Sequence, residues 1–572
     1  MADFWNLLDQ VSKSWQALIL DGQLWARLDL HSFPGIPQEV VIRLAQSAGS
    51  FVKSLNFAGH ANLVPDTMAY ITSDLCLNGT PLSASHNQLN TIDLQGCVSL
   101  TTRCLHQLLV RSKSLLKLNV KGLAVVTNTT CEVISTFCPN LTSLNMSRCS
   151  NMDADGINFL TRSANRRGEH LKLKELRLSG LQNVDDAMMS ELARAAPFLE
   201  VLDLSYSRQL HNSAVEAFVA CSEPFESVRA LGVDTVLITP SDLGREANDS
   251  GSKVLRRRVT RLRHIILSYC VMLTDNACTN LSYSVPELEL LELAGLPDVK
   301  DTGLVKLLQQ TPNIRRLDLE EALITDAVIR AITPIVDTQD EGTATPTNSQ
   351  PKPKQPGRAL QHLNIAYATS VSDDALLSLV RNCRQLTVLE VDNTRIGRNV
   401  LREFVRLSRE RKALNARIVA TDCRSITDGL VKELVPLTRP RLGFRRYDAR
   451  KLNFLDVRDG NEDEMKLGQD ECDEERVVVK SFYSWQTVDA VKALRDKRRK
   501  AAGRKVGSES SNGAGSDVEG GTGVGNGRKS GSTRWWSPGG RRTGNSRGSG
   551  RNSGSASPIL PDLNGGDGCI MM

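Results

Sequence analysis

The sequence predicts an α/β solenoid, a stack of strand–turn–helix units, and three observations point to this fold class. A phrase of the form Leu-x-x-Leu-x-Leu recurs along the chain. Six of its steps have one length, since the first positions 89→115, 115→141, 173→199, 262→288, 288→314 and 360→386 are each 26 residues apart. Polar, turn-forming residues follow the phrases and lead into segments that we expect to be helical. The first positions are Leu89, Leu115, Leu141, Leu173, Leu199, Val228, Leu262, Leu288, Ile314, Leu360 and Leu386, with weaker copies at Val52 and Leu452.

A period of about 20–29 residues with this phrase is the signature of leucine-rich repeats, in which each unit supplies one strand, one turn and one helix. In a chain of 572 residues, about twelve such units fit between residues 50 and 458 and should form a right-handed horseshoe. A solenoid of this kind has no single deep cleft, but it offers a long concave sheet to another macromolecule.

The parts of each unit follow the strand in a regular order. A cysteine stands three residues beyond the last leucine-type position of several phrases, at Cys97, Cys149 and Cys270. These positions should point into the interior, and no Cys-x-x-Cys pair occurs among the 13 cysteines. We therefore interpret them as small buried thiols rather than disulfides or metal ligands. Asp275 and Asp301 stand at helix starts, where a side-chain oxygen can cap free backbone N–H groups.

These units resemble the cysteine-containing leucine-rich repeats of F-box proteins, over roughly residues 52–457. The resemblance implies a substrate receptor of an SCF-type ubiquitin ligase. Such a receptor holds a target on the concave face, while a cullin recruited through an adaptor supplies the ubiquitin for proteasomal degradation.

Residues 1–30 resemble the second half of an F-box, which docks on the adaptor as a small helical bundle. The resemblance implies that the adaptor-binding side chains are Trp15, Leu18, Leu24, Trp25 and Leu28. Their helical spacing suits apolar stripes, and aromatic anchors dominate helix-in-groove interfaces. The Leu-Pro-containing helix that normally opens an F-box does not precede them, so the motif is truncated. The alternative is an N-terminal cap that seals the open end of the repeat core.

Other segments interrupt or follow the repeats. The insertions at 234–258 and 336–357 are polar, the first ending in Arg256-Arg257-Arg258, and both predict exposed loops. Residues 459–480 predict an acidic linker. Residues 481–502 predict an amphipathic, basic helix that either caps the solenoid or carries a nuclear-localisation signal. Residues 503–572, rich in Gly, Ser, Asn and Arg, predict a disordered tail.

The tail ends in Cys569-Ile570-Met571-Met572, a Cys-aliphatic-aliphatic-X box. A terminal Met favours farnesylation of the cysteine, and a flexible tail would let a transferase reach it. One lipid chain binds a membrane only marginally, so neighbouring arginines should add attraction to anionic lipid. An accidental match is the alternative interpretation.

The residues that flank the last two leucines of each phrase should point out of the core, because side chains alternate along a strand. The early units place mixed charges there. The later units are acidic, with Arg316 and His362 the only clear bases, and we predict that they bind a basic target segment. The alternative is that solvated strands simply carry charge. The predicted target-binding residues are Glu292, Asp318, Glu320, Glu390 and Asp392.

The sequence contains no pattern typical of an enzyme. Its 8 histidines are scattered without metal-ligand spacing, and no nucleophile–base arrangement is evident, so we expect a non-catalytic chain without a metal or other cofactor. No apolar run approaches the ~18 residues of a membrane span. Most of the net charge of +6 lies in the expected tail, which disfavours nucleic-acid binding by the folded part.

We therefore predict a cytoplasmic substrate receptor whose partners are the SCF adaptor, a cullin and protein targets. Farnesylation would add membrane association, and the basic helix leaves a nuclear location open. The alternative function is a membrane-anchored scaffold or signalling adaptor that uses the same concave surface without ligase activity.

Overall fold

The computed structural model describes residues 22–76, 86–224, 232–243, 254–335, 355–438 and 475–481. The chain divides into two units, Met1–Lys500 and Ala501–Met572, and every described residue belongs to the first. Several expectations lie outside the described residues: the N-terminal part up to residue 21, the helix expected beyond residue 481, the tail at 503–572 and the box at Cys569.

Short strands from successive units pair into one parallel sheet. In the described residues this sheet has 14 strands, and their order in space follows their order in the chain. The central residue of each strand is in register with its neighbours, as Leu55, Ile92 and Leu118 show. The strands are β1 (Arg27–Asp29), β2 (Ser54–Asn56), β3 (Thr91–Asp93), β4 (Lys117–Asn119), β5 (Ser143–Asn145), β6 (Glu175–Arg177), β7 (Val201–Asp203), β10 (His264–Ile266), β11 (Leu290–Glu292), β12 (Arg316–Asp318), β13 (His362–Asn364), β14 (Val388–Glu390), β15 (Arg417–Ala420) and β16 (Val478–Ser481).

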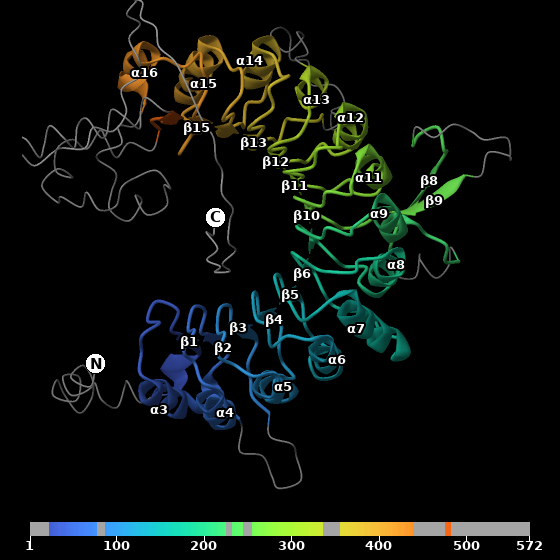
Figure 1. Cartoon of the computed structure of the whole chain (residues 1–572), viewed down its shortest axis with the longest axis vertical. Coiled ribbons are helices and arrows are strands. Elements are labelled where there is room, and N and C mark those ends of the chain that lie inside the picture. Colours follow the sequence, from blue (N-terminus) through green and yellow to red (C-terminus); the bar gives the residue numbers. More distant parts are fainter. Residues whose placement is uncertain are drawn as a thin grey trace, which may run out of the picture. The chain divides into compact units, whose positions relative to one another are not determined.

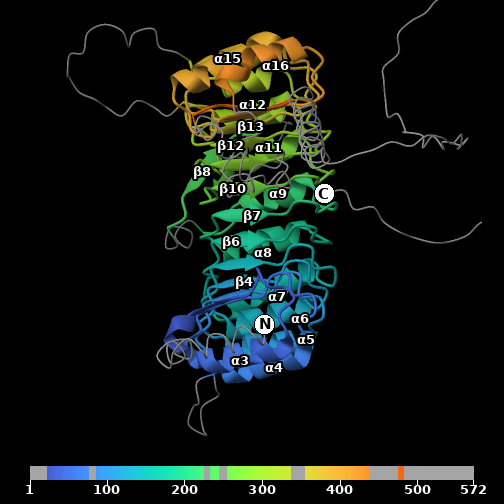
Figure 2. The same ribbon diagram turned by 90° about the vertical axis from the view of Figure 1, so that its left-hand side faces the viewer.

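Helices follow most strands and form the second layer. Figure 1 shows the strands along the inner side of the repeat unit and the helices along its outer side, and Figure 2 shows the units stacked one on another. The α-helices are α3 (Gln38–Ala48), α4 (Pro65–Asp74), α5 (Thr102–Arg111), α6 (Asn128–Phe137), α7 (Ala154–Arg166), α8 (Asp186–Ala195), α9 (Asn212–Val219), α11 (Asp275–Leu281), α12 (Asp301–Gln309), α13 (Asp326–Ala331), α14 (Asp373–Asn382), α15 (Arg398–Glu410) and α16 (Asp428–Leu434). Three short 3-10 helices are η1 (Gly22–Trp25), η2 (Gly49–Phe51) and η3 (Val435–Leu437).

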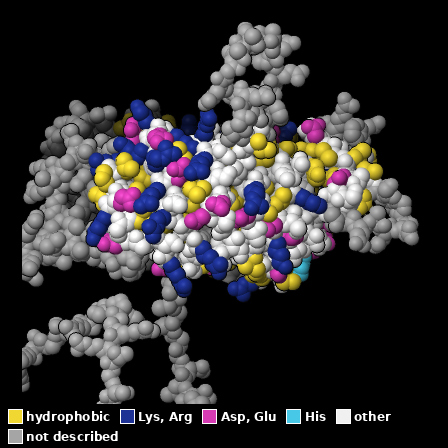
Figure 3. All heavy atoms as spheres, turned by 90° about the horizontal axis from the view of Figure 1, so that it is seen from above, with side chains coloured by type: hydrophobic (Ala, Val, Ile, Leu, Met, Phe, Trp, Pro, Cys, Tyr) yellow, Lys and Arg dark blue, Asp and Glu magenta, His cyan; other side chains and the backbone are white. Residues whose placement is uncertain are grey.

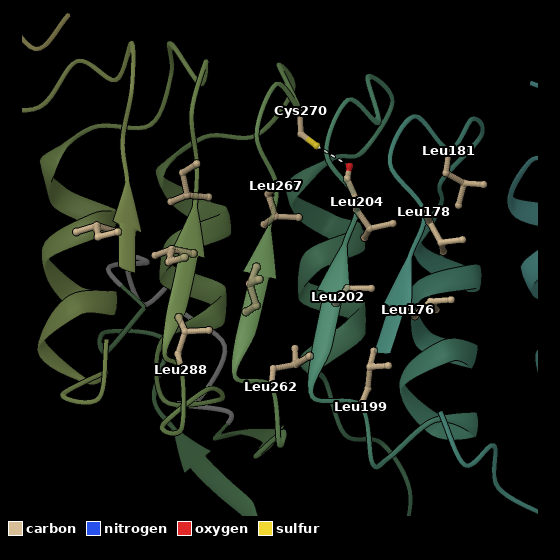
Figure 4. Packing of buried hydrophobic residues seen from close by; sticks show 14 of the residues in the cluster. Leu176, Leu178, Leu181, Leu199, Leu202, Leu204, Leu262, Leu267, Cys270 and Leu288 are labelled. Atoms are coloured by element: carbon tan, nitrogen blue, oxygen red, sulfur yellow. Dashed lines mark hydrogen bonds between the residues drawn. The ribbon is translucent and has the colours of Figure 1, made fainter. Parts of the chain in front are cut away.

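The leucines of the repeated phrase form rows between the two layers. One continuous core cluster extends from Leu28 to Val479, and Figure 4 shows its middle section, where Leu176, Leu202 and their neighbours point away from the open face of the sheet. Each such side chain contributes about 1.5–3 kcal/mol when fully buried. A single unit cannot bury its own apolar face, so the stacking of neighbours stabilises all of them. The prediction of a leucine-rich-repeat solenoid is confirmed.

The cysteines after the strands link consecutive units. Each thiol lies within hydrogen-bond distance of a backbone carbonyl oxygen in the preceding unit and is buried, as expected for structural thiols. The four pairs are Cys97 Sγ to Phe57 O at 3.1 Å, Cys149 Sγ to Val120 O at 3.3 Å, Cys270 Sγ to Leu204 O at 3.1 Å and Cys423 Sγ to Val391 O at 3.1 Å. All cysteines of the described residues are free and buried.

Asp275 and Asp301 also connect units, which corrects the expectation that they cap their own helices. Each is the first residue of its helix, one position too late for a cap. The cap of α11 is Thr274, whose side chain accepts a hydrogen bond from Asn276 N. The Asp301 carboxylate instead accepts hydrogen bonds from Thr325 of the next unit, from its backbone N at 2.9 Å and its hydroxyl at 2.5 Å.

The repeats begin before residue 50, because β1 pairs with β2. The expectation that Leu24, Trp25 and Leu28 share a helical stripe is wrong. The 3-10 helix η1 ends at Trp25, and Leu28 lies in strand β1 opposite Leu55, with 1% of its surface exposed. A strand at this position protects the open edge of the β2 backbone, which supports the alternative of an N-terminal cap for this part of the segment.

The insertion near residue 234 differs from the expected loop. Strand β7 pairs directly with β10, and residues 228–231, with which the phrase at Val228 begins, lie outside the described residues. The described parts of the insertion form a separate antiparallel hairpin of β8 (Thr235–Ile238) and β9 (Leu255–Arg258). Far from being exposed, Arg257 and Arg258 are 2% and 5% exposed.

Two acidic side chains and two helix ends hold these buried guanidinium groups. Arg257 donates to the Glu216 carboxylate at 2.6 Å and to the Glu216 backbone oxygen at 3.2 Å. Arg258 donates to Ala193 O at 2.6 Å and to both Glu223 carboxylate oxygens. Ala193 and Glu216 lie near the carboxyl ends of α8 and α9, where the helix dipole favours a cation. The basic run therefore anchors the hairpin to the helix layer.

The carboxyl-terminal end of the solenoid extends further than expected. Strand β16 pairs in parallel with β15, so the last residues of the segment expected as an acidic linker, 459–480, are part of the sheet. The phrase at Leu452 lies outside the described residues, as does most of the insertion at 336–357.

Candidate binding surface

Two rows of acidic residues cross the inner face of the sheet between β11 and β15. Register places Glu292, Asp318, Asn364 and Glu390 side by side on adjacent strands. Glu320 and Asp392 each stand two residues further along and continue a second row. Five predicted target-binding residues, Glu292, Asp318, Glu320, Glu390 and Asp392, therefore come together on one face, and all are partly exposed.

Two of these acids have basic partners on the same face. Glu292 forms an ion pair with Arg316 at 3.3 Å, and Glu390 pairs with His362 at 3.3 Å and with Arg417. Hydrogen bonding to His362 and the charge of Arg417 lower the pKa of Glu390. The field at this position is therefore weaker than the acid count alone implies.

Asp318 and Glu320 have a different environment. Among the described residues neither forms an ion pair with a cation, and both accept a hydrogen bond from the Asn364 amide, at 3.0 Å and 3.4 Å. Burial, and then the nearby Asp318 charge, raise the pKa of Glu320. Burial also raises the pKa of Asp392. A cation supplied by a partner would offset the repulsion between these carboxylates. The Asp318–Glu320 pair is therefore the part of the face that should attract a cation most strongly.

Arg417 and Lys480 are inner-face residues that the sequence pattern did not identify. They come from β15 and β16, whose core positions carry small or β-branched residues instead of leucine, so the repeated phrase is not evident. One signal was available for β15. Cys423 follows Ala420 by three residues, the same offset that relates Cys97 to Leu94.

A second feature, also missed, lies at the carboxyl ends of the strands. Two residues beyond the last core position of each phrase, the backbone turns with positive φ, and we call this set of positions the turn row. Its residues are Gly59, Gly96, Gly122, Arg148, Gly180, Tyr206, Tyr269, Gly295, Glu321, Tyr367, Asn393 and Asp422. Glycine adopts this conformation freely, whereas other residues there cost about 1–3 kcal/mol each. Three tyrosines at such positions are therefore not explained by folding alone.

The rings of the turn row are ordered by their neighbours. Tyr206 and Tyr269 stack with ring centroids 4.8 Å apart and planes at 13°. The Arg148 guanidinium lies over the Tyr206 ring, 5.8 Å from its centroid. Gly295 leaves room for Tyr269, because a Cβ there would lie 2.5 Å from the ring. Tyr206 and Tyr367 remain 46% and 48% exposed.

The expected adaptor-binding residues are placed only in part. Trp15 and Leu18 lie outside the described residues. Leu24 is 62% exposed, Trp25 is partly buried against the core, and Leu28 is a core residue that no partner can reach in the folded chain. The lipidation site Cys569 lies outside the described residues.

The outer face near α14, α15 and α16 carries both signs of charge. Figure 3, which views that end from above, shows Lys and Arg side chains interspersed with Asp and Glu. Several are paired, including Arg402 with Glu433 at 2.6 Å and Arg381 with Glu403 at 2.9 Å. This face therefore presents no field of a single sign.

No group of three or more His, Cys, Asp or Glu side chains in the described ranges is placed to hold a metal ion. No helix in those ranges is both long enough and apolar enough to cross a bilayer.

The strand order, the buried phrase and the thiol contacts define the chain as a leucine-rich-repeat solenoid. No protein-family model matches the sequence. Among solved structures, the yeast Rad7–Elc1 complex contains a chain that is similar at 14% identity, with a TM-score of 0.45, over 74% of this chain and 94% of that one.

Two further structures share similarity with the chain. One is the complex of TLR13 with ssRNA13, at 15% identity and a TM-score of 0.34, over 62% of this chain and 38% of that one. The other is the leucine-rich-repeat protein LegL7 from Legionella pneumophila, at 12% identity and a TM-score of 0.29, over 52% and 82%. Similarities at this level do not indicate what this chain binds.

Proposed function

We propose that this chain is the substrate-recognition subunit of an SCF-type ubiquitin ligase, a non-catalytic receptor that holds targets for ubiquitination and proteasomal degradation. The main support for target recognition is the Asp318–Glu320 pair, which lies on the rigid inner face beside the exposed turn row. Pre-organised charges and aromatic side chains on regular elements are typical of recognition surfaces. A basic segment of the target fits this face by charge.

The amino-terminal end supports the adaptor part of the proposal. Leu24 in η1 and Phe51 in η2 are 62% and 51% exposed, and these two short helices pack against each other. Exposed apolar side chains gathered at one end suit a protein contact. They belong to, or lie next to, the segment that resembles an F-box.

Affinity purification of the full-length chain followed by quantitative mass spectrometry tests this function. Adaptor and cullin peptides should co-purify with the wild type and fall sharply with Leu24→Asp. The matched control is Leu237→Asp, which changes another exposed leucine (69% exposed) on the separate hairpin. Absence of adaptor and cullin from the wild-type sample would contradict the ligase assignment.

The alternative is a membrane-anchored scaffold without ligase activity, favoured by the Cys569-Ile570-Met571-Met572 box. A farnesyl group together with Arg541 and Arg542 would provide the two signals that stable membrane binding needs. Cys569→Ser should then move the protein from the membrane to the soluble fraction. An intact mass without a farnesyl group, from cells with an active transferase, would exclude the anchor. The anchor is compatible with either function, so co-purification of the adaptor discriminates between them.

A further inference from the structure

We propose that an exposed apolar strip along one edge of the sheet binds an apolar side chain of the target, next to the basic residues that the inner face attracts. This inference rests on the proposed function and deepens it, since it names the chemistry of the target segment. We call the strip the apolar rim, and all of its members are exposed. They are Tyr206, Val271, Met272, Pro297, Leu323 and Tyr367.

The rim residues come from five consecutive units, those of β7, β10, β11, β12 and β13. Val271, Pro297 and Leu323 each follow a turn-row residue by two positions, and Tyr206 and Tyr367 belong to the turn row itself. Backbone hydrogen bonds tie these turns to the next unit. The bonds run from Tyr206 N to Ser268 O at 2.8 Å, from Tyr269 N to Ala294 O at 2.8 Å, from Gly295 N to Glu320 O at 2.9 Å and from Glu321 N to Ala366 O at 3.0 Å. Neighbouring strands lie about 4.8 Å apart, so side chains at equivalent positions lie side by side.

The rim ends where the same loop position becomes polar. Arg208 precedes the run and Thr369 follows it. Val98, in the unit of β3, is as exposed as Leu323, 64% in each case, but the same position of both adjacent units carries alanine. Single exposed apolar side chains are common on protein surfaces, whereas a contiguous group of them indicates a contact surface. The rim is such a group.

Tyrosine rings make part of this surface rigid and continuous. The Tyr206 and Tyr269 rings stack with centroids 4.8 Å apart. The Tyr269 ring also covers Gly295, where a Cβ would lie 2.5 Å from two ring atoms, so the aromatic surface extends from the unit of β7 to that of β11. Rings that are held in place before binding lose little conformational entropy on association. This role gives a reason for tyrosine at positive φ, where glycine folds at lower cost.

Acidic side chains next to the rim select the charge of the partner. In the unit of β12, Asp318 and Glu320 on the inner face are followed by Glu321 in the turn row and Leu323 in the rim. Burial, followed by the charges of Glu321, Glu320 and Asp318, raises the pKa of the Tyr269 phenol, which agrees with carboxylates close to that ring. A segment with apolar and basic side chains therefore complements this edge, and an acidic segment is repelled.

A second copy of this chain complements the rim less well than a basic target segment does. In a two-fold pairing the same surface patch of both copies forms the interface. The Asp318, Glu320 and Glu321 carboxylates of one copy would then lie near those of the other, and like charges oppose such a contact. A basic segment meets no such repulsion.

Selection of dodecapeptides from a random phage-displayed library on the purified full-length protein tests the proposal. We expect the selected peptides to combine a large apolar residue with lysine or arginine at a fixed offset. Synthetic copies should bind about tenfold more weakly to Leu323→Asp and to Val271→Asp than to the wild type. The matched control is Val98→Asp, which places the same charge at the same loop position of a distant unit and should leave binding unchanged.

Changes in the peptide test the same site without altering the protein. Serine in place of the apolar residue, or glutamine in place of the basic ones, should each weaken binding, and only the second change should reduce its dependence on salt. Circular dichroism of each variant verifies that the solenoid remains folded. Because peptide binding needs neither adaptor nor cullin, its outcome is independent of the co-purification experiment.

Several outcomes would overturn the proposal. They are the absence of enriched peptides, enrichment of acidic ones, unchanged binding to both Leu323→Asp and Val271→Asp, or an equal loss with Val98→Asp. Light scattering that shows a dimer of the wild type and a monomer of Leu323→Asp would identify a second copy as the occupant instead. Binding of apolar, basic peptides without adaptor would support the rim and reject the ligase assignment.

Discussion

The Cys270 thiol donates a hydrogen bond to the Leu204 carbonyl oxygen, 3.1 Å away, although the two residues are 66 positions apart in the sequence (Figure 4). The hairpin insertion accounts for this large separation, because it lies between β7 and β10 without disturbing their pairing. The thiol satisfies a carbonyl at the point where the strand ends and the chain turns. It therefore joins the two units on either side of the insertion.

Cys270→Ala should lower the free energy of unfolding by roughly 1–2 kcal/mol, because it leaves a small cavity and removes one of two donors from the Leu204 carbonyl, which still accepts a hydrogen bond from Ser207 N at 3.2 Å. Cys270→Ser retains a donor and should lose less. Urea denaturation followed by circular dichroism measures both. Equal stability of the wild type and the alanine variant would show that the thiol contributes no net stability.

Stability should decline in alkaline solution above pH 9. Burial raises the pKa of the Cys97 and Cys270 thiols from 9.0 to about 12. Unfolded thiols ionise near pH 9 while folded ones stay neutral, so the stabilisation is complete below pH 9 and is lost as the pH rises toward 12. Denaturation midpoints at pH 8 and pH 10.5 measure the change. The slope should be smaller in a variant with both cysteines replaced by alanine, and an identical slope would contradict this origin.

Arg257→Met should lower the free energy of unfolding by about 2 kcal/mol or more. The buried guanidinium donates to both the carboxylate and the backbone oxygen of Glu216, and its removal leaves these acceptors without that donor. The double variant Arg257→Met, Glu216→Gln should recover part of the loss, because the remaining partner is then uncharged. A double-mutant cycle in urea gives the coupling energy, and a value near zero would mean that the pair is not formed in solution.

Charge reversal on the inner face should affect target binding unequally. Asp318→Lys should weaken association with a basic target more than Glu390→Lys, since Glu390 is already paired with the Arg417 guanidinium. The dependence of affinity on salt should flatten more for Asp318→Lys as well. Titrations at two ionic strengths against a target mapped by cross-linking provide the comparison. Stronger binding by Asp318→Lys would refute the predicted charge preference.

The two leucines near the amino terminus should respond differently to alanine. Leu28→Ala should cost roughly 2–5 kcal/mol of stability, because it removes a core side chain. Leu24→Ala should change stability by no more than about 0.5 kcal/mol, because that side chain is 62% exposed. Thermal denaturation of both variants separates a folding role from a partner-binding role. Equal losses would mean that Leu24 is covered by another part of the chain in solution.

The repeat architecture was predictable because each unit repeats the same strand–turn–helix pattern, with leucine-type residues at the same positions. A leucine at a fixed position is buried by the leucines of its neighbours, so the phase of the phrase alone indicates strand, turn and helix. The buried role of Cys97 and the clustering of Glu292, Asp318 and Glu390 on one face follow from the same phase. The sequence also reveals the acidic character of the later units.

Where the phrase is absent or misleading, only the tertiary structure determined how the chain is arranged. Strands β15 and β16 have no leucine at their core positions and join the sheet because neighbouring strands offer free backbone groups, which a side-chain pattern does not record. The sequence predicts an exposed, solvated Arg257 side chain. In the structure it is buried and donates hydrogen bonds to Glu216, 41 positions away. The Tyr206–Tyr269 stack and the pairing of Arg417 with Glu390 also depend on which strands become adjacent. Local periodicity thus determines the unit, while long-range pairing of backbone and charge determines the surface that a partner meets.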